Sequence, residues 1–338
     1  MLILEAAVAA LAWLGRQGTL ALAMSVFFGI ALPPLATVLK HVFVEALIIL
    51  LMLAFLRVEP ESLRQQFRRP GLVIAASLWT MLAVPLALCG AALLFGLPQL
   101  SQALFLALLL QAIAPPVVGS PALATLMGLD AALSLATLIL ATAATPLTVP
   151  LFIAAFGDPA LDISPLGLGL RLLGMLGGAW LAATLFRRWK GQDWIDRNRH
   201  PIDGVSVMAL LVFSIGLMDG VTANILAQPL LVATLVAFVF CLTLVLVGVT
   251  CLVMHRAGRS QAMALGLAVG SRNMGLMVAA VGGAIPELTW LYFAVAQFPI
   301  YTLPHLLKPL IRRWVGVDGL PARDGSVRPP APDLMRQD

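Results

Sequence analysis

The sequence predicts an all-α integral membrane protein with ten transmembrane helices, arranged as two inverted five-helix repeats. The first observation is composition: 61% of the 338 residues are hydrophobic and 11% are charged, whereas soluble domains carry about 25% charged residues. The second is a series of ten apolar segments, and the third is a tripeptide that occurs in both halves of the chain. So few polar side chains cannot cover the surface of a water-soluble protein of this length.

A helix needs about 20 apolar residues to cross the hydrocarbon core of a bilayer. Apolar runs bounded by charges, proline or glycine predict ten such helices, of which the second is short. They cover residues 18–38, 42–56, 71–95, 101–127, 131–156, 165–186, 203–222, 225–254, 260–284 and 287–311.

These segments divide the chain into five parts. Residues 1–17 are apolar but too short to span and carry Glu5, so we expect an amphipathic helix on the membrane surface. The first repeat covers 18–156, and 157–202 holds an outer loop, the sixth helix and a cytoplasmic linker. Residues 203–314 complete the second repeat, which spans 165–314. The tail, 315–338, is rich in proline, glycine and charge and is expected to be a disordered cytoplasmic end.

The basic residues predict the orientation. With ten spans, both termini lie on one side, and eighteen of the 21 lysine and arginine residues fall in segments on that side. The positive-inside rule therefore places both termini in the cytoplasm. The net charge of +5 is then an orientation signal, and no nucleic-acid partner is expected. Arginine outnumbers lysine, which is typical of GC-rich bacterial genomes, so we expect a multi-pass protein of a bacterial inner membrane.

The repeated tripeptide lies in the fourth segment of each half. Val118-Gly119-Ser120 and Val269-Gly270-Ser271 share this place, and because each half has five segments, the second would enter the membrane from the opposite face. Prolines and glycines predict that both segments are broken helices. Non-helical backbone at membrane depth lines a polar cavity or is buried by protein. The alternative is that these residues only kink packed helices.

Three stretches resemble one known family. The run LRVEPESLRQQFRRP (56–70) resembles its linker after the second helix. PPVVGSPALATLMGLDAALSLATLILATAATPLTVP (115–150) resembles its fourth and fifth helices, and GSRNMGL (270–276) its ninth-helix break. The chain is thus similar to the bile acid:sodium symporter superfamily over about residues 18–312. The resemblance implies a core domain, in which helices 4 and 9 cross at their breaks, beside a panel domain. It also implies sodium-coupled secondary transport of organic anions, either bile-acid-like steroids or smaller carboxylates.

The chain departs from the sodium ligands that the resemblance implies. Ala268 and Arg272 stand where sodium-coupled members have Glu and Gln in the ninth helix. Pro121 replaces an Asn, Leu138 a hydroxyl residue, and Thr80 a Gln. Sodium needs several oxygen ligands and a compensating negative charge. We therefore expect the usual sodium sites to be degraded, with sodium a doubtful coupling ion, no other metal and no cofactor. The remnants of the ion sites are Ser120, Ser134, Ala268 and Asn273.

Arg272 interrupts an otherwise uncharged stretch, from Ser260 to Ile285. The hypothesis is that its guanidinium takes the place of sodium, donates to carbonyls at the half-helix ends and faces the substrate cavity. Such a planar fork suits a carboxylate or sulfonate. The predicted function is secondary transport of small organic anions by alternating access. The substrate-binding residues would be Arg272, Asn273, Ser271, Ser120, Pro121 and Thr80.

Several alternatives remain open. Arg272 could form a static ion pair with Glu45 or Asp219, although both acids are expected near the membrane interface, where Glu45 could meet Lys40 or His41. The protein could be a sodium-coupled symporter with rearranged ion sites, a channel, or a membrane binding or sensor protein that does not transport. The sequence has no HExxH, no GxSxG and no pair of mid-span aspartates, so an enzyme is not expected. The expected partners are a small organic anion and the lipid bilayer.

Overall fold

The computed structural model describes residues 18–57, 70–157, 163–282 and 285–316. In these ranges the chain is helical, and β-structure is limited to one isolated bridge between Pro116 and Arg272. The predicted all-α class is confirmed. The predicted surface helix at 1–17 lies outside the described residues, as does the predicted tail from residue 317 onward.

Five of the ten predicted segments are long apolar helices that could cross a membrane. The first is continuous in direction but changes type, from α6 (Pro70–Leu78) through a π-helical turn, η1 (Trp79–Ala83), to α7 (Val84–Leu94). The others are α11 (Ala131–Phe156), α12 (Pro165–Lys190), α14 (Arg199–Leu217) with α15 (Val221–Ala227), and α16 (Pro229–Val253).

Of the other five predicted segments, 42–56 is a single short helix and the remaining four are divided. Segment 18–38 is divided at Leu32 into α2 (Gly18–Ala31) and α3 (Pro33–Lys40), because Pro33 cannot donate to the preceding turn. α3 then meets α4 (Phe43–Arg57) at 69°, and this bent pair would be a sixth span by length and composition. The remaining elements are α8 (Leu97–Leu100), α9 (Gln102–Ile113), α10 (Ser120–Leu126), α13 (Gln192–Arg197), η3 (His255–Ala257), α17 (Arg259–Gly270), α18 (Met274–Val281), α19 (Glu287–Val295) and α20 (Gln297–Val315).

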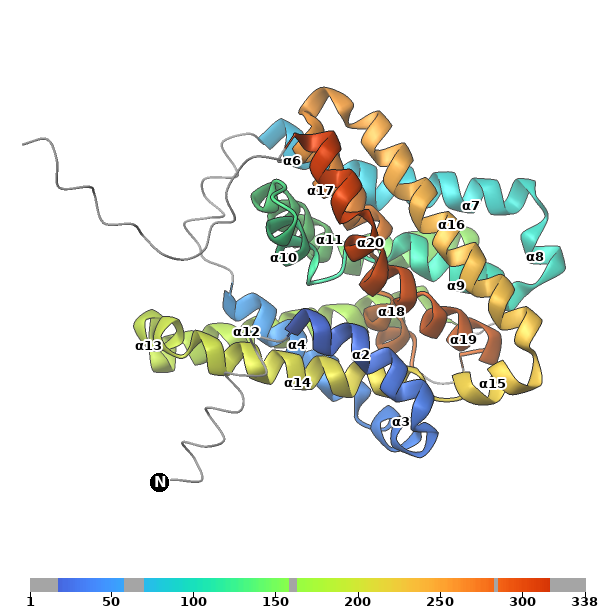
Figure 1. Cartoon of the computed structure of the whole chain (residues 1–338), viewed down its shortest axis with the longest axis horizontal. Coiled ribbons are helices and arrows are strands. Elements are labelled where there is room, and N and C mark those ends of the chain that lie inside the picture. The colour runs from blue at the N-terminus through green and yellow to red at the C-terminus, as the bar shows by residue number, and fades with distance from the viewer. Residues whose placement is uncertain (1–17, 58–69, 158–162, 283–284, 317–338) are drawn as a thin grey trace, which may run out of the picture.

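Two groups of helices lie side by side. α2, α4, α12 and α14, here called the panel helices, run along one another in the lower part of Figure 1, and α14 packs against both α2 and α4. The second group surrounds the short helices α9, α10, α17 and α18, here called the crossing helices. Around them, α16 packs against α17, and α11 packs against α10 and against α12 of the panel.

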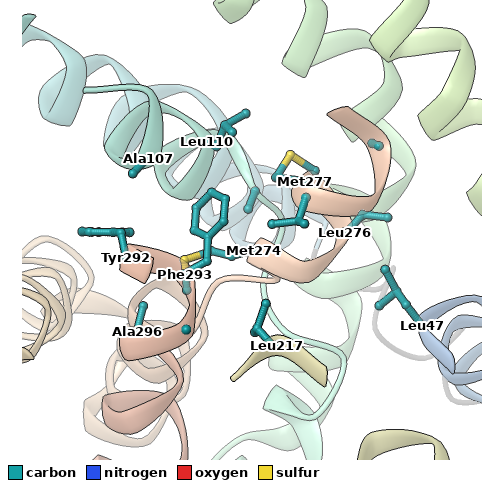
Figure 2. Close-up of a cluster of buried hydrophobic side chains, with 14 of the residues drawn as sticks. Leu47, Ala107, Leu110, Leu217, Met274, Leu276, Met277, Tyr292, Phe293 and Ala296 are labelled. Atoms are coloured by element: carbon teal, nitrogen blue, oxygen red, sulfur yellow. The ribbon is translucent and has the colours of Figure 1, made fainter. Parts of the chain in front are cut away.

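The main hydrophobic core joins the two groups through α18. Its side chains lie between Ala107 and Leu110 of α9 and Leu47 of α4, as Figure 2 shows. Phe293 of α19 packs in the same cluster and is fully buried. The short helix after the ninth-segment break is therefore held by apolar packing on both sides.

Candidate functional site

Two extended backbone segments cross at the centre of the molecule. α9 ends at Ile113 and α10 begins at Ser120, while α17 ends at Gly270 and α18 begins at Met274. The N–H of Val117 donates to the carbonyl of Ser271, and the N–H of Asn273 donates to that of Pro115, both at 2.8 Å. Each break thus supplies partners for backbone groups that the other leaves free, which is how non-helical backbone is tolerated away from water.

The repeated tripeptide does not occupy equivalent places in the two breaks. Gly119 follows the first extended segment and caps the start of α10, whereas Gly270 precedes the second and is the last residue of α17. The shared tripeptide lies in the two segments that are broken, but the local structure around it differs between them. The tripeptide match therefore gives no structural register between the halves.

The guanidinium of Arg272 is held by three backbone carbonyls. Nε donates to Val269 at 2.9 Å, and Nη1 donates to Ala114 at 2.9 Å and to Thr80 at 3.1 Å. Val269 lies in the last turn of α17, and Ala114 directly follows α9. The prediction that carbonyls at half-helix ends accept the donors of Arg272 is confirmed. The residue is 1% exposed.

The third acceptor exists because of the π-helical turn in α6–α7. In a regular helix the carbonyl of Thr80 would accept from the N–H of Val84, but that N–H donates to Trp79 instead. The next candidate donor is Pro85, which has no N–H. The carbonyl of Thr80 is left without a partner in its own helix and accepts from Arg272. Irregular π-turns are often found at functional sites.

Helix dipoles offset part of the charge of Arg272. The C-terminal end of a helix carries about half a negative charge. α9 and α17 both end beside the guanidinium, so together they offer about one negative charge to one positive charge. The N-terminal end of α18, which begins at Met274, carries the opposite partial charge, so this compensation is partial.

The alternative that Arg272 forms an ion pair with Asp219 is wrong. In the described ranges the ion pairs join Lys40 to Asp219, at 2.9 Å, and Arg57 to Asp203, at 2.7 Å. Lys40 therefore meets Asp219 rather than Glu45, which is exposed in the first turn of α4. Asp219 follows the end of α14, and Thr37 also donates to it, at 2.7 Å.

Ser120 and Ser134, predicted as remnants of ion sites, lie together, with their hydroxyls 3.4 Å apart between α10 and α11. Asn273 caps α18, where its side-chain oxygen accepts from the N–H of Leu276 at 3.2 Å. Ala268 is fully buried in α17. Among the described residues, the buried polar atoms without a hydrogen-bond partner include Ser77 Oγ, Thr80 Oγ1, Thr137 Oγ1 and Arg272 Nη2.

A cavity of about 240 Å³, here called the crossing cavity, lies between the breaks and the panel helices α4 and α14. Of the predicted substrate residues, Arg272 and Asn273 line it. Pro121 lines an adjacent cavity, while Thr80, Ser120 and Ser271 are buried elsewhere at the crossing. Sequence reasoning missed four polar side chains of its wall: Arg57, Ser206, Gln297 and Tyr301.

Arg57 is the accessible cation of the crossing cavity. Its side chain is 47% exposed, and Nη2 makes its contacts with Asp203 and with the hydroxyl of Ser206, the latter at 2.6 Å. By contrast, the carbonyls that bind Arg272 belong to residues outside the cavity wall. Arg57 could have been noticed from its position at the end of the second apolar segment. Its charge was used only to predict the orientation of the chain in the membrane.

A second cavity, of about 630 Å³, is lined by residues from the far ends of α3, α14 and α18. Trp290 closes one side of it: its indole N–H donates to the carbonyl of Asp219 at 3.1 Å, and the ammonium of Lys40 lies 4.6 Å from its ring centre. Phe43 lines this cavity and packs on Phe213, which lines the crossing cavity, with ring centres 6.3 Å apart. Packed aromatic rings thus lie between the two cavities.

Comparison with known proteins identifies the family of this chain. No curated protein matches the chain in sequence. The model of one family, described as the sodium bile acid symporter family, matches residues 44–229, which is more than half of the chain. The match includes the first break at 114–119 and ends before the second break, where Arg272 lies. The chain belongs to the sodium bile acid symporter family.

Proposed function

We propose that this protein is a secondary transporter of small organic anions that works by alternating access without sodium. Family membership supports transport of organic anions and not enzymatic catalysis. The observation that carries the departure from sodium coupling is the guanidinium of Arg272, bound to the carbonyls of Val269, Ala114 and Thr80 at the crossing.

The residues at the crossing do not fit a sodium ion. A cation bound there would need oxygen ligands and would meet a fixed positive charge instead. Ala268, where the resemblance implies a carboxylate, offers no ligand oxygen from its side chain and is fully buried. We propose that Arg272 is a permanent replacement for the coupling cation.

The crossing cavity suits an anion with an apolar body. Most of its wall is aliphatic, and its polar groups are few and include the cation Arg57. Its volume of about 240 Å³ lies below the ~300–1,000 Å³ of common ligand pockets, which favours a small anion over a steroid. Asn273 lies at the wall where α18 begins, so the partial positive charge of that helix end also faces this region.

The first test is sodium dependence. A thermal-stability screen against organic anions, in sodium and in choline buffers, identifies a ligand, because binding to the folded state raises its stability. Uptake of that ligand into proteoliposomes should be equal with and without a sodium gradient. Strong stimulation by sodium in the wild type would sink the proposal and favour a sodium-coupled symporter with rearranged ion sites.

Two variants sharpen this test. Arg272→Gln leaves three buried carbonyls without their donor and should abolish uptake in either buffer. Ala268→Glu combined with Arg272→Gln introduces the two side chains that the resemblance implies for sodium binding. We expect the double variant to regain some uptake, now only in sodium. Arg256→Gln, in the exposed turn η3, is the control and should behave as wild type.

A further inference from the structure

The crossing cavity is one of three adjacent cavities that lead toward the outer surface of the helix bundle. A middle cavity of about 170 Å³ shares the wall residues Ala54, Arg57, Val118 and Ala122 with the crossing cavity. An outer cavity of about 460 Å³ shares Phe55, Ile139 and Thr142 with the middle one. The series runs between the panel helices α4 and α12 on one side and α10 and α11 on the other.

The outer cavity opens on a surface suited to lipid. Leu173 and Trp180 of α12 line it and are each 57% exposed, on a helix long and apolar enough to span a membrane. Its wall is otherwise mostly apolar, with Arg187 at one end. An exposed apolar surface on such a helix faces hydrocarbon chains and not water.

The shared walls consist of side chains that can move. Phe55 is partly exposed, and Ile139 and Thr142 belong to the facing helix α11. Side-chain rotation takes picoseconds to nanoseconds where packing permits it. These three side chains therefore form a wall that can yield to a flexible chain without movement of the helices.

Two wall residues of the middle cavity support an apolar passage. Pro121 and Leu138 line it, at the two positions where the resemblance implies polar sodium ligands. An alkyl chain that passed polar side chains there would displace their water, which costs free energy. Pro121 and Leu138 have no polar side-chain groups, so an alkyl chain can pass them without this cost. The sequence change that removes ion ligands also makes this wall apolar.

We propose that single-chain organic anions enter the crossing cavity sideways from the bilayer, through this series of cavities, here called the lateral passage. The anionic head binds at Arg57, which lines both the crossing and the middle cavity, and the alkyl tail lies along the passage. The contacts of Arg57 with Ser206 and Asp203 both use Nη2. A guanidinium has five N–H donors, so the others can meet a sulfonate or carboxylate. This inference rests on the proposed transport of organic anions.

The test fills the outer cavity without disturbing the fold. Gly177 lines it, and a side chain added there meets no atom within 4 Å. Gly178, the next residue of α12, also has open space but does not line the cavity, which makes Gly178→Phe the matched control. Ala143→Phe, from the opposite wall on α11, is a second filling variant.

The probes are radiolabelled decanesulfonate, which partitions into lipid, and butanesulfonate, which stays in water. Sulfonates are used because they remain charged and do not cross bilayers as neutral acids. We expect Gly177→Phe and Ala143→Phe to lower decanesulfonate uptake into proteoliposomes about tenfold, because the added ring occupies space that the chain needs. Butanesulfonate uptake should be kept, and Gly178→Phe should match the wild type with both probes.

The possible outcomes separate this inference from the proposed function. Equal decanesulfonate uptake by Gly177→Phe and Gly178→Phe would overturn the lateral passage and leave the transport function standing. An equal loss of both probes in the filling variants would also overturn it, because the effect would not depend on the chain. No uptake of either probe by the wild type would contradict transport of organic sulfonates itself. Thermal unfolding of each variant confirms that the compared proteins are folded.

Discussion

At the scale of single residues, Arg272 raises the question of how a buried charge is stabilised. A charged side chain at the centre of a membrane helix costs about 2.5–3.5 kcal/mol on insertion scales. Hydrogen bonds to charged groups contribute about 1.5–3 kcal/mol each, and Arg272 makes three with backbone carbonyls. These bonds offset much of the cost, against which stands Nη2 of Arg272, a buried donor without a partner among the described residues. The residue is thus held in place by backbone that the breaks and the π-turn leave free.

The hydroxyl of Thr80 is the opposite case, because it is buried and has no partner among the described residues. Thr80→Val keeps the shape and the backbone carbonyl that binds Arg272 and removes only this hydroxyl. An unsatisfied buried polar group costs about 1–3 kcal/mol, so we expect the thermal unfolding temperature to stay the same or rise.

Thr145→Val is the matched comparison. Thr145 is equally buried, but its hydroxyl donates to the carbonyl of Ala141 at 2.8 Å. Its removal should lower the unfolding temperature slightly, since a hydrogen bond of about 0.5–1.5 kcal/mol is lost. If Thr80→Val proved the more destabilising of the two, the hydroxyl of Thr80 would have a polar partner in the folded protein, and our account of this position would be wrong.

At the scale of the helices, close approach depends on where glycine lies. A side chain added at Gly216 of α14 would lie 2.9 Å from the backbone carbonyl of Leu39 in α3. Small residues allow helices to approach in this way inside membranes. The contact joins the panel helix α14, which lines the crossing cavity, to α3, whose Lys40 lines the second cavity, so the packing here affects the site.

Gly216→Ala should therefore destabilise the protein. The clash is with backbone, which cannot rotate away, so we expect a loss of about 1–3 kcal/mol, as for other overpacked sites. Gly248→Ala in α16 is the control, because a side chain there meets nothing within 4 Å. Alanine favours helix over glycine by about 0.5–1 kcal/mol, so the control should unfold at the same or a higher temperature. Equal destabilisation by both changes would refute this packing argument.

The pattern of helices shows what the sequence could and could not predict. Long uninterrupted apolar runs predicted α11 at its observed bounds and α12 and α16 to within four residues, because length and hydropathy largely determine such helices. The two breaks were predicted because proline and glycine act locally. The 69° bend between α3 and α4 and the π-turn at Trp79–Ala83 were missed, since both depend on packing against other helices.

The same limit applies to the candidate site. The sequence could predict that backbone carbonyls at helix ends accept from Arg272, because the last turn of a helix always leaves carbonyls without partners. Thr80 was predicted as a substrate residue, but it contributes a carbonyl to Arg272 because Pro85 lies five residues further on. Arg57 was missed because its place in the cavity wall arises from the packing of α4 against α14, far apart in sequence.

At the scale of the whole molecule, the proposed mechanism requires the ten-span inverted topology. Five helices are long enough to cross alone, or six with the bent pair, so the other crossings must be made by broken helices in series. In this topology α9 with α10 and α17 with α18 would be such pairs, since a further helix follows each break. Five crossings in each half would place equivalent breaks in opposite orientations, which is the arrangement that alternating access uses.

This topology makes a specific prediction for four exposed positions. With both termini in the cytoplasm, Gln99 in α8 and Gln228 before α16 face outward, whereas Gln192 in α13 and Arg256 in η3 face the cytoplasm. Single cysteines at these positions, in a background with Cys89, Cys241 and Cys251 replaced, are exposed to a membrane-impermeant thiol reagent. In right-side-out vesicles we expect labelling at 99 and 228 only, and in inside-out vesicles at 192 and 256 only.

The four positions form two pairs, and each pair tests whether the chain crosses the membrane between its two members. Gln99 and Gln192 are separated by an odd number of crossings in the ten-span arrangement, and so are Gln228 and Arg256. If α9 with α10 were a re-entrant loop that returned to the side it entered from, the parity would change and positions 99 and 192 would react from the same side. Labelling of 99 and 192 together would place that fault between α9 and α12, and labelling of 228 and 256 together would mean that α16 does not cross the membrane. Either result would remove the inverted repeat, and with it the reason to expect that two opposed breaks alternate in exposing one cavity.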